Sequence, residues 1–238
     1  MQNHENLKAL FFNTTLKSDA AESHTQRLLN VSASIMEKAG VRTRHIHLRS
    51  HNVPAGVQPD MRDHGHDHDD WPGLWKLVDQ SNIIIVGTPI RLGEESSHCR
   101  KLIERLYAMS GELNDKGQSI FYGKVGGCVV TGNEDGLKHV AMSVLYALNH
   151  LGITIPPQAD CGWLGEAGPG PSYGDEREDS CPAGFDNNFT QQNTTIMSWN
   201  CMHLAQMLAG LGIPEKGNNR ELWDEGERFG FENPRPLK

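Results

Sequence analysis

The sequence lacks a long hydrophobic run. No apolar segment approaches the roughly 18–20 residues that a membrane-spanning helix requires, and Met1–Leu7 is polar, without the apolar core of a secretory signal. We therefore expect a cytoplasmic protein with no membrane partner. Hydrophobic residues make up 37% of the chain and charged residues 22%, a composition typical of globular proteins.

Positive charge is also scarce. The chain has 22 Lys and Arg residues against 30 Asp and Glu, a formal net charge of −8. Nucleic acids are bound through a basic face, so we predict no nucleic-acid partner. The five cysteines include no Cys-x-x-Cys pair, which argues against a structural zinc site or a cysteine-ligated cluster. We expect free, mostly buried thiols.

The stretch over residues 81–93 organises the chain. Ile83–Val86 is a run of β-branched apolar residues without polar alternation, which is typical of a strand buried on both faces of a parallel sheet. Gly87 ends the run, and a segment with helical spacing of apolar residues follows, with Ser96 or Ser97 placed to cap it. Ligands of open α/β sheets bind outside the carboxyl ends of such strands.

The rest of the chain alternates between strand and helix patterns. Four more strands are predicted, at Lys8–Phe12, Arg44–Leu48, Val125–Thr131 and from Ile153. Helices are predicted at Leu28–Ala39, from Trp71 to Val78, at Val140–Leu151 and at Ile196–Leu211. The helix that Ser96 or Ser97 caps is predicted to end at about Met109. This pattern predicts an α/β fold: a five-stranded parallel sheet in the order 2-1-3-4-5 with helices on both faces. We expect a single domain over residues 1–238, with its core at about 7–211 and a peripheral tail at 212–238.

Two nucleotide-binding motifs are missing. The first strand is not followed by G-x-G-x-x-G, and the chain has no G-x-x-x-x-G-K-[ST]. The first strand instead leads into a loop with several Ser and Thr residues before a helix, where free N–H groups and the helix dipole attract an anion such as phosphate. Alternatively, these Ser and Thr side chains only cap the helix.

Small polar residues, Gly and Pro follow three predicted strands at the same sheet edge. The motifs are residues 12–17 with 23–25, residues 87–96, and residues 130–133. In this order they resemble the flavodoxin-like FMN-binding proteins, especially the NAD(P)H-dependent FMN reductases and quinone reductases, over about residues 7–165. The resemblance implies a flavodoxin-like fold, FMN as cofactor and NADPH or NADH as co-substrate.

The resemblance also implies a set of FMN-binding residues. The phosphate would be held by Thr15, Lys17, Ser23, His24 and Thr25. The ribityl chain and the isoalloxazine ring would be lined by Pro89, Ile90, Arg91, Leu92 and Gly93, and the other side of the ring by Thr131, Gly132, Asn133 and Gly136. Where the family usually has aromatic residues, this chain has Arg91 and Leu92. Either the flavin is less stacked here, or Arg91 addresses the pyrimidine end of the flavin or an anionic substrate.

The flavin itself carries the chemistry in such proteins, so no catalytic side chain is predicted. The leading hypothesis is an FMN-dependent NAD(P)H oxidoreductase that passes hydride to a quinone, a flavin or a similar small-molecule acceptor. One alternative is a flavodoxin-type electron-transfer protein without nicotinamide turnover, and another is a flavodoxin-like protein that has lost its flavin. Residues 165–238 exceed what a minimal carrier needs, and we expect them to build a substrate wall or a subunit contact in a homo-oligomer, either a dimer or a tetramer.

A His/Asp-rich segment, His64–Asp70, stands apart from these motifs. Imidazole and carboxylate groups are suitable metal ligands, but such tracts are also common in solvated loops. We favour the solvated loop and predict no functional metal.

Overall fold

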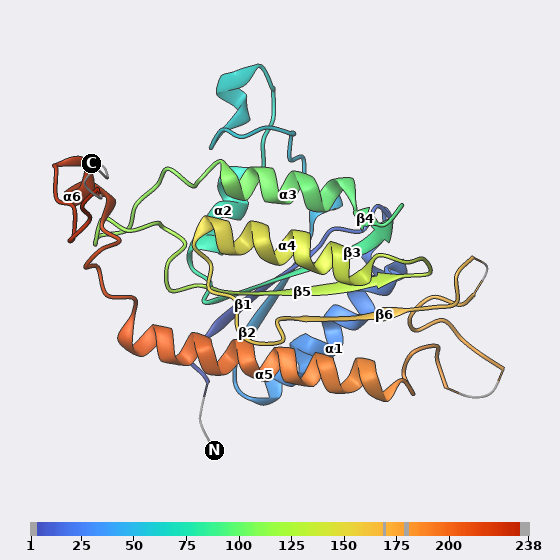
Figure 1. Cartoon of the computed structure of the whole chain (residues 1–238). Helices are drawn as coiled ribbons and strands as arrows, with labels where there is room; N and C mark the ends of the chain where they lie inside the picture. The colour runs from blue at the N-terminus through green and yellow to red at the C-terminus, as the bar shows by residue number, and fades with distance from the viewer. Residues whose placement is uncertain (1–3, 169, 179–180, 234–238) are drawn as a thin grey trace, which may run out of the picture.

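A parallel sheet forms the centre of the molecule (Figure 1). The structure is a computed structural model that describes residues 4–168, 170–178 and 181–233. Its strands are β1 (Lys8–Asn13), β2 (Arg42–His47), β3 (Ile83–Arg91), β4 (Glu94–Glu95), β5 (Val125–Gly132) and β6 (Asp160–Leu164). Five of them run in the order β2-β1-β3-β5-β6, and β4 pairs antiparallel with the end of β3. This arrangement confirms the predicted parallel sheet and its order, because the two-residue β4 only extends β3 into a hairpin.

Helices cover both faces of the sheet (Figure 1). On one face lie α2 (Trp71–Asp79), α3 (Ser97–Tyr107) and α4 (Leu137–Leu151), and on the other lie α1 (His24–Lys38) and α5 (Asn188–Leu211). A short helix, α6 (Arg220–Asp224), and three 3-10 turns, η1 (Ala20–Glu22), η2 (Leu48–Ser50) and η3 (Met61–His64), complete the set. None of the helices within the described ranges is both long and apolar enough to cross a membrane.

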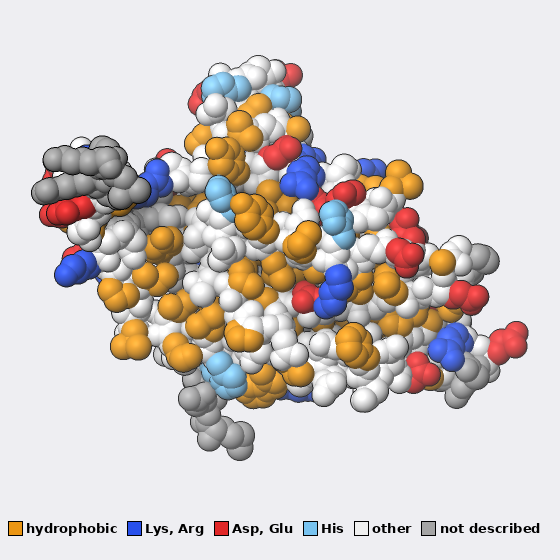
Figure 2. Space-filling model, viewed as in Figure 1, with side chains coloured by type: hydrophobic (Ala, Val, Ile, Leu, Met, Phe, Trp, Pro, Cys, Tyr) orange, Lys and Arg blue, Asp and Glu red, His pale blue; other side chains and the backbone are white. Residues whose placement is uncertain are grey.

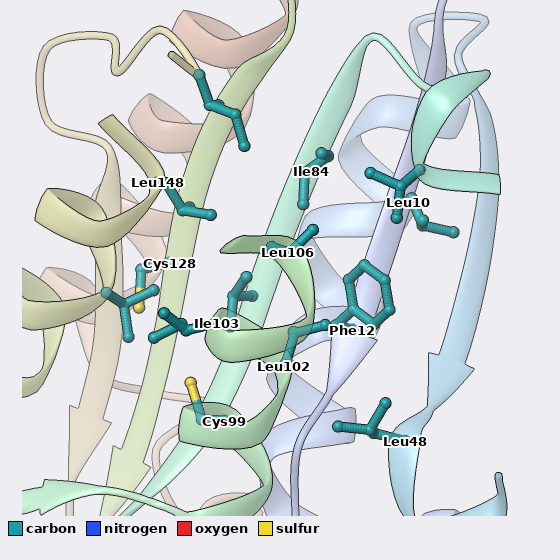
Figure 3. Packing of buried hydrophobic residues seen from close by; sticks show 14 of the residues in the cluster. Leu10, Phe12, Leu48, Ile84, Cys99, Leu102, Ile103, Leu106, Cys128 and Leu148 are labelled. Atoms are coloured by element: carbon teal, nitrogen blue, oxygen red, sulfur yellow. The ribbon is translucent and has the colours of Figure 1, made fainter. Parts of the chain in front are cut away.

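The central strand β3 is apolar on both sides because helices cover both sides. Ile84 and Val86 belong to the core beneath α2, α3 and α4, whereas Ile83 and Ile85 belong to the core beneath α1 and α5. This alternation follows from the two-residue period of a strand. Figure 3 shows the first core, in which residues of β1, β3 and α3 interdigitate.

Two caps position helices, and the first of them, Ser96, is one of the two residues that the sequence predicts. Ser96 is the N-cap of α3, and its hydroxyl accepts a hydrogen bond from the Cys99 amide at 3.1 Å. The same hydroxyl donates to the Thr14 carbonyl at 2.6 Å, which ties the loop after β1 to the start of α3. Gly152 ends α4 with a φ of 106°, a left-handed conformation that favours glycine.

Three elements differ from the sequence prediction. β3 does not stop at Gly87 but continues to Arg91, because residues 87–89 still pair with β5 and the last two residues pair with β4. The segment from Ile153 to Ile155 makes a single bridge, Thr154 to Val125, and the last strand is β6, further along the chain. Pro156 and Pro157 intervene, and proline cannot donate to a ladder of hydrogen bonds. Helix α5 also begins eight residues before the predicted start, because Asn187 caps it by accepting from the Thr190 amide at 2.9 Å.

The described part of the tail, residues 212–233, is largely exposed and lies at the end of the sheet opposite the segment between β6 and α5 (Figure 1). Residues 234–238 of the tail lie outside the described residues, as do residues 1–3 at the start of the chain. All five cysteines are free, and four of them are buried, which confirms the expected thiols.

The His/Asp-rich segment belongs to a projection formed by residues 51–70 that rises above α2 and α3, and histidine side chains lie on its surface (Figures 1 and 2). Asp69 departs from the expected solvated loop. Its side chain is fully buried, where it accepts a hydrogen bond from Arg105 at 2.5 Å and from the Trp71 amide at 2.9 Å. Asp69 therefore anchors the projection to α3. Within the described residues, no group of three His, Cys, Asp or Glu side chains is placed to hold a metal ion.

Candidate functional site

A pocket of about 370 Å³ lies at the carboxyl ends of β1, β3 and β5. This volume lies within the range of small-molecule sites. The loop after β1, the start of α1, the end of β3, the loop after β5 and the segment after β6 supply its walls. The lining residues are Thr15, Lys17, His24, Thr25, Pro89, Arg91, Thr131, Gly132, Asn133, Glu134, Ser172 and Tyr173.

Nine of the fourteen predicted site residues line this pocket. They are Thr15, Lys17, His24, Thr25, Pro89, Arg91, Thr131, Gly132 and Asn133. The structure therefore brings the three predicted loops together, because parallel strands end at the same edge of a sheet. Their role in binding FMN stays a prediction.

The other five predicted residues lie outside the lining, each for a local reason. Ser23 is fully buried as the N-cap of α1, where its hydroxyl accepts from the Gln26 amide at 3.1 Å, so the capping alternative holds for this residue. Ile90 is fully buried in the core under α3 and α4. Leu92 is 94% exposed at the tip of the β3–β4 hairpin.

Gly93 and Gly136 contact each other instead of the pocket. A Cβ atom at Gly136 would lie 2.7 Å from the Gly93 carbonyl oxygen, and its φ is 120°. The two glycines let the hairpin approach the start of α4.

Helix α1 packs closely against β3 because the strand has a glycine, Gly87, where the two meet. A Cβ atom at Gly87 would lie 2.6 Å from Cδ1 of Leu29 in α1. The first residues of α1, His24 and Thr25, line the pocket. First-turn N–H groups have no intrahelical acceptor, and the helix dipole is positive there. The start of α1 thus forms an anion-attracting end of the pocket.

Side-chain donors gather at this end. The hydroxyl groups of Thr25 and Thr131 are buried and 2.7 Å apart, so one hydrogen bond joins α1 to β5. Lys17 Nζ donates to the Glu22 carbonyl at 2.7 Å and lies 3.1 Å from His24 Nε2. One cation, one imidazole and two hydroxyl groups therefore face the same space.

His24 is held from behind by the segment after β6. Its Nδ1 atom lies 3.1 Å from the Tyr173 carbonyl oxygen and 3.4 Å from a carboxylate oxygen of Asp175. Arg27 of α1 also pairs with Asp175, at 3.3 Å. Burial and the neighbouring charge of Lys17 lower the pKa of His24, while Asp175 raises it less.

Tyr173 and Ser172 form a wall that the sequence analysis did not assign residue by residue. Ser172 donates to Asn133 Oδ1 at 3.0 Å, and Asn133 Nδ2 donates to the Pro171 carbonyl at 2.9 Å. The Tyr173 ring is buried between Trp163 and Phe185, and burial raises its pKa to about 12. The sequence signal for this wall was the extra length of residues 165–238, of which residues 169, 179, 180 and 234–238 lie outside the described residues.

Arg91 and Glu134 lie at the opposite side of the pocket. Glu134 Oε1 accepts from the Leu92 amide at 3.2 Å, and this contact holds Leu92 at a φ of 53°. Arg91 Nη1 donates to the Ile90 carbonyl at 2.8 Å. This side of the pocket carries both signs of charge.

The donor set fits a ligand with an anionic end and a larger, flatter body. One end offers a helix N-terminus, Lys17, His24 and hydroxyl groups, which suit a phosphate. The remainder offers Pro89, Gly132 and the Tyr173 wall, whose small or planar groups permit close approach of a ring. The residues present therefore fit FMN.

Comparison with known proteins supports the same ligand class. A family model described as NADPH-dependent FMN reductase matches residues 8–162. The match covers all five parallel strands except the end of β6, and it includes every wall of the pocket except the segment after β6.

Two curated relatives are similar over most of the chain. An 8-demethyl-8-aminoriboflavin-5'-phosphate synthase of Streptomyces davaonensis is 34% identical over 207 residues, which cover 85% of this chain and 78% of that protein. A divalent metal cation transporter of Mycobacterium bovis is 51% identical over 204 residues, or 86% of this chain. The chain spans about 29% of the length of that transporter.

A solved structure is similar over nearly the whole chain. It is RosB with bound 8-demethyl-8-formylriboflavin-5'-phosphate, which shares 32% sequence identity and superposes with a TM-score of 0.80. The similarity covers 98% of this chain and 90% of that one, so it extends beyond the family model into the Tyr173 wall and α5.

Proposed function

The chain belongs to the NADPH-dependent FMN reductase family, and from this premise we propose that it is an FMN-dependent oxidoreductase that uses NADH or NADPH to reduce a small-molecule acceptor such as a quinone or a flavin. The observation that carries the proposal is the pocket itself. It combines an anion-attracting end with a body lined by small and planar groups, and it is built from the three loops that resemble the family's motifs.

The chain's own residues would bind and orient the cofactor. Lys17, His24 and the start of α1 would hold the phosphate, with Thr15 and Thr25 adding hydroxyl donors. The backbone near Gly132 would lie against the ring, and N–H groups there can stabilise negative charge. When bound, FMN would supply hydride and electron transfer between the two substrates.

The open mouth of the pocket supports turnover with a nicotinamide. A hydride donor has to lie flat on one face of the flavin, and a shielding aromatic side chain would prevent this. The hairpin carries Arg91 and Leu92 in the usual place of aromatic residues, and Leu92 points into solvent. Arg91 would then meet a nicotinamide phosphate or an acidic acceptor.

A second candidate is that FMN is the substrate and is chemically modified. The observation that favours it is the 34% identity to a synthase of an aminoriboflavin phosphate, together with the TM-score of 0.80 to a structure that holds a formylriboflavin phosphate. Both candidates require the same FMN pocket, and they differ in whether the flavin leaves the protein unchanged.

The proposal includes location and assembly. A cytoplasmic location is supported by the five free thiols, since disulfides form in oxidising compartments. The net charge of −8 supports the absence of nucleic-acid and anionic-membrane partners. A homo-oligomer is supported by apolar side chains exposed on α3 and α4, namely Tyr107, Met142 and Tyr146. Sedimentation of the purified chain measures the assembly.

The test of the proposal is flavin binding followed by product analysis. We expect protein incubated with FMN and then desalted to keep a flavin absorption spectrum in the visible range. After aerobic incubation with NADH or NADPH, the extracted flavin should have the mass of FMN. An extracted flavin of changed mass would support the second candidate, and a colourless protein would overturn both.

A further inference from the structure

The hydrogen bonds of His24 fix the tautomer of its ring in the free pocket. Nδ1 faces two acceptors, the Tyr173 carbonyl at 3.1 Å and the Asp175 carboxylate at 3.4 Å, while the donor Arg27 Nη1 lies farther away, at 3.5 Å. The nearer acceptors assign the proton to Nδ1. Nε2 faces the Lys17 ammonium at 3.1 Å, which can only donate. Nε2 is therefore an acceptor, and the ring is neutral.

The free pocket opposes a charge on this ring. Burial and the positive charge of Lys17 are the two largest influences that lower the pKa of His24, and Arg27 adds a smaller one. The position of His24 in the first turn of α1 works in the same direction, because the N-terminus of a helix repels cations. Asp175 is the group that favours the charged form, and it lies behind the ring.

A bound phosphate group would reverse the effect that Lys17 has on the charge of His24. Its oxygens are acceptors with a charge close to −2, and they would compete with His24 Nε2 for the Lys17 ammonium. Nε2 would then face an acceptor in place of a donor, while Nδ1 keeps its bonds to Tyr173 and Asp175. Both ring nitrogens donate only when the imidazole is protonated.

We propose that His24 takes up a proton when the phosphate of FMN enters the pocket, so that an imidazolium and the Lys17 ammonium together balance the phosphate dianion. The inference rests on the proposed function, because it requires FMN to bind with its phosphate at this end. It assigns Asp175, contributed by the segment after β6, as a positioning residue that stabilises the charged ring.

The expected linkage has a definite sign. The pKa of His24 is lower in the free pocket than in the loaded one, so a proton is bound on loading at any pH between the two values. The His24 contribution to FMN affinity therefore grows as the pH falls through the loaded pKa, and it levels off below the free pKa. The second ionisation of the phosphate, with a pKa of about 6, acts in the opposite direction and has to be separated from it.

Nuclear magnetic resonance of the histidine rings in the full chain separates the ionisation of His24 from that of the phosphate. The signal of His24 among the 12 histidines is assigned by its loss in His24→Gln, and it is titrated with pH in the free protein, with FMN and with riboflavin, which has no phosphate. We expect the pKa of His24 to be higher with FMN than in the free protein by about one pH unit or more. With riboflavin it should stay at the free value.

Calorimetry in buffers of different ionisation enthalpy gives a second readout. Wild-type protein should take up more protons per FMN than His24→Gln, and Asp175→Asn should fall between them, because it keeps the ring but loses the charge that stabilises it. The phosphate contributes equally in all three proteins, so the differences report on His24. His150→Gln, which changes an exposed histidine at the end of α4, is the matched control and should behave as wild type.

The outcomes separate this inference from the proposed function. Tight FMN binding with an unchanged pKa of His24 would overturn the inference alone, and His24 would then only orient Lys17. Failure of FMN to bind at all would overturn the proposed function, and the inference with it.

Discussion

Replacing Thr25 with valine removes one hydroxyl group from the pocket and keeps the shape of the side chain. In the structure this hydroxyl lies 2.7 Å from the hydroxyl of Thr131, and both side chains are buried. If the pair contacts the phosphate, the loss of one hydrogen bond weakens FMN binding by about 1–2 kcal/mol, which raises Kd roughly 5- to 30-fold. Loss of the Thr25–Thr131 hydrogen bond also lowers the free energy of unfolding by about 1 kcal/mol.

Fluorescence titration with FMN and with riboflavin measures the first effect, and urea denaturation of the free protein measures the second. The loss of affinity should be confined to FMN, because riboflavin has no phosphate. Thr25→Ser keeps the hydroxyl and should retain most of the affinity. Thr195→Val, which removes an exposed hydroxyl on α5, should change neither quantity. Unchanged FMN affinity in Thr25→Val would refute the placement of the phosphate beside Thr25.

Three further predictions concern other parts of the molecule. Arg91→Ala should raise KM for the nicotinamide or a charged acceptor more than it lowers FMN occupancy, because Arg91 lies at the edge of the pocket. Steady-state kinetics measures KM and flavin absorbance measures occupancy, and a loss of occupancy with an unchanged KM would contradict this prediction. Asp69→Asn should lower the free energy of unfolding by about 3–5 kcal/mol, because it leaves the buried Arg105 charge uncompensated; denaturation of the double variant with Arg105→Met should recover much of the loss. Chelation followed by dialysis should leave FMN binding unchanged, and a stoichiometric metal whose removal abolishes activity would overturn the view that His64–Asp70 has no functional metal.

The arrangement of the sheet could be predicted because its signals are local. The unbroken apolar run in β3 requires helices on both faces, and the alternation of strand and helix patterns requires parallel strands. Parallel strands bring the loops that follow them to one edge of the sheet, so the position of the pocket could be predicted from the strand pattern alone.

The choice of residues within each loop could be predicted only in part. β3 continues as a strand to Arg91, so Pro89 and Arg91 point to one side and Ile90 to the other. The family resemblance suggested a continuous loop and therefore included Ile90. The Gly93–Gly136 contact joins residues from two loops, and such a contact is a property of the folded structure.

The Tyr173 wall could not be predicted from local pattern at all. Tyr173 meets His24 across 149 positions of the sequence, and Arg27 meets Asp175 across 148. The segment has no periodicity, because its residues are fixed by contacts with α1 and with Asn133 rather than by a strand or helix of its own. The length of the chain after residue 165 indicated only that this part builds a substrate wall or a subunit contact.

Anaerobic stopped-flow reduction of the FMN-loaded protein tests the proposed function most directly. We expect NADH or NADPH to bleach the flavin absorbance without oxygen, and addition of a quinone to restore the oxidised spectrum. If neither nicotinamide bleaches the flavin while dithionite does, the protein is not a nicotinamide-dependent reductase, and an electron carrier or a flavin-modifying enzyme would account for the same pocket.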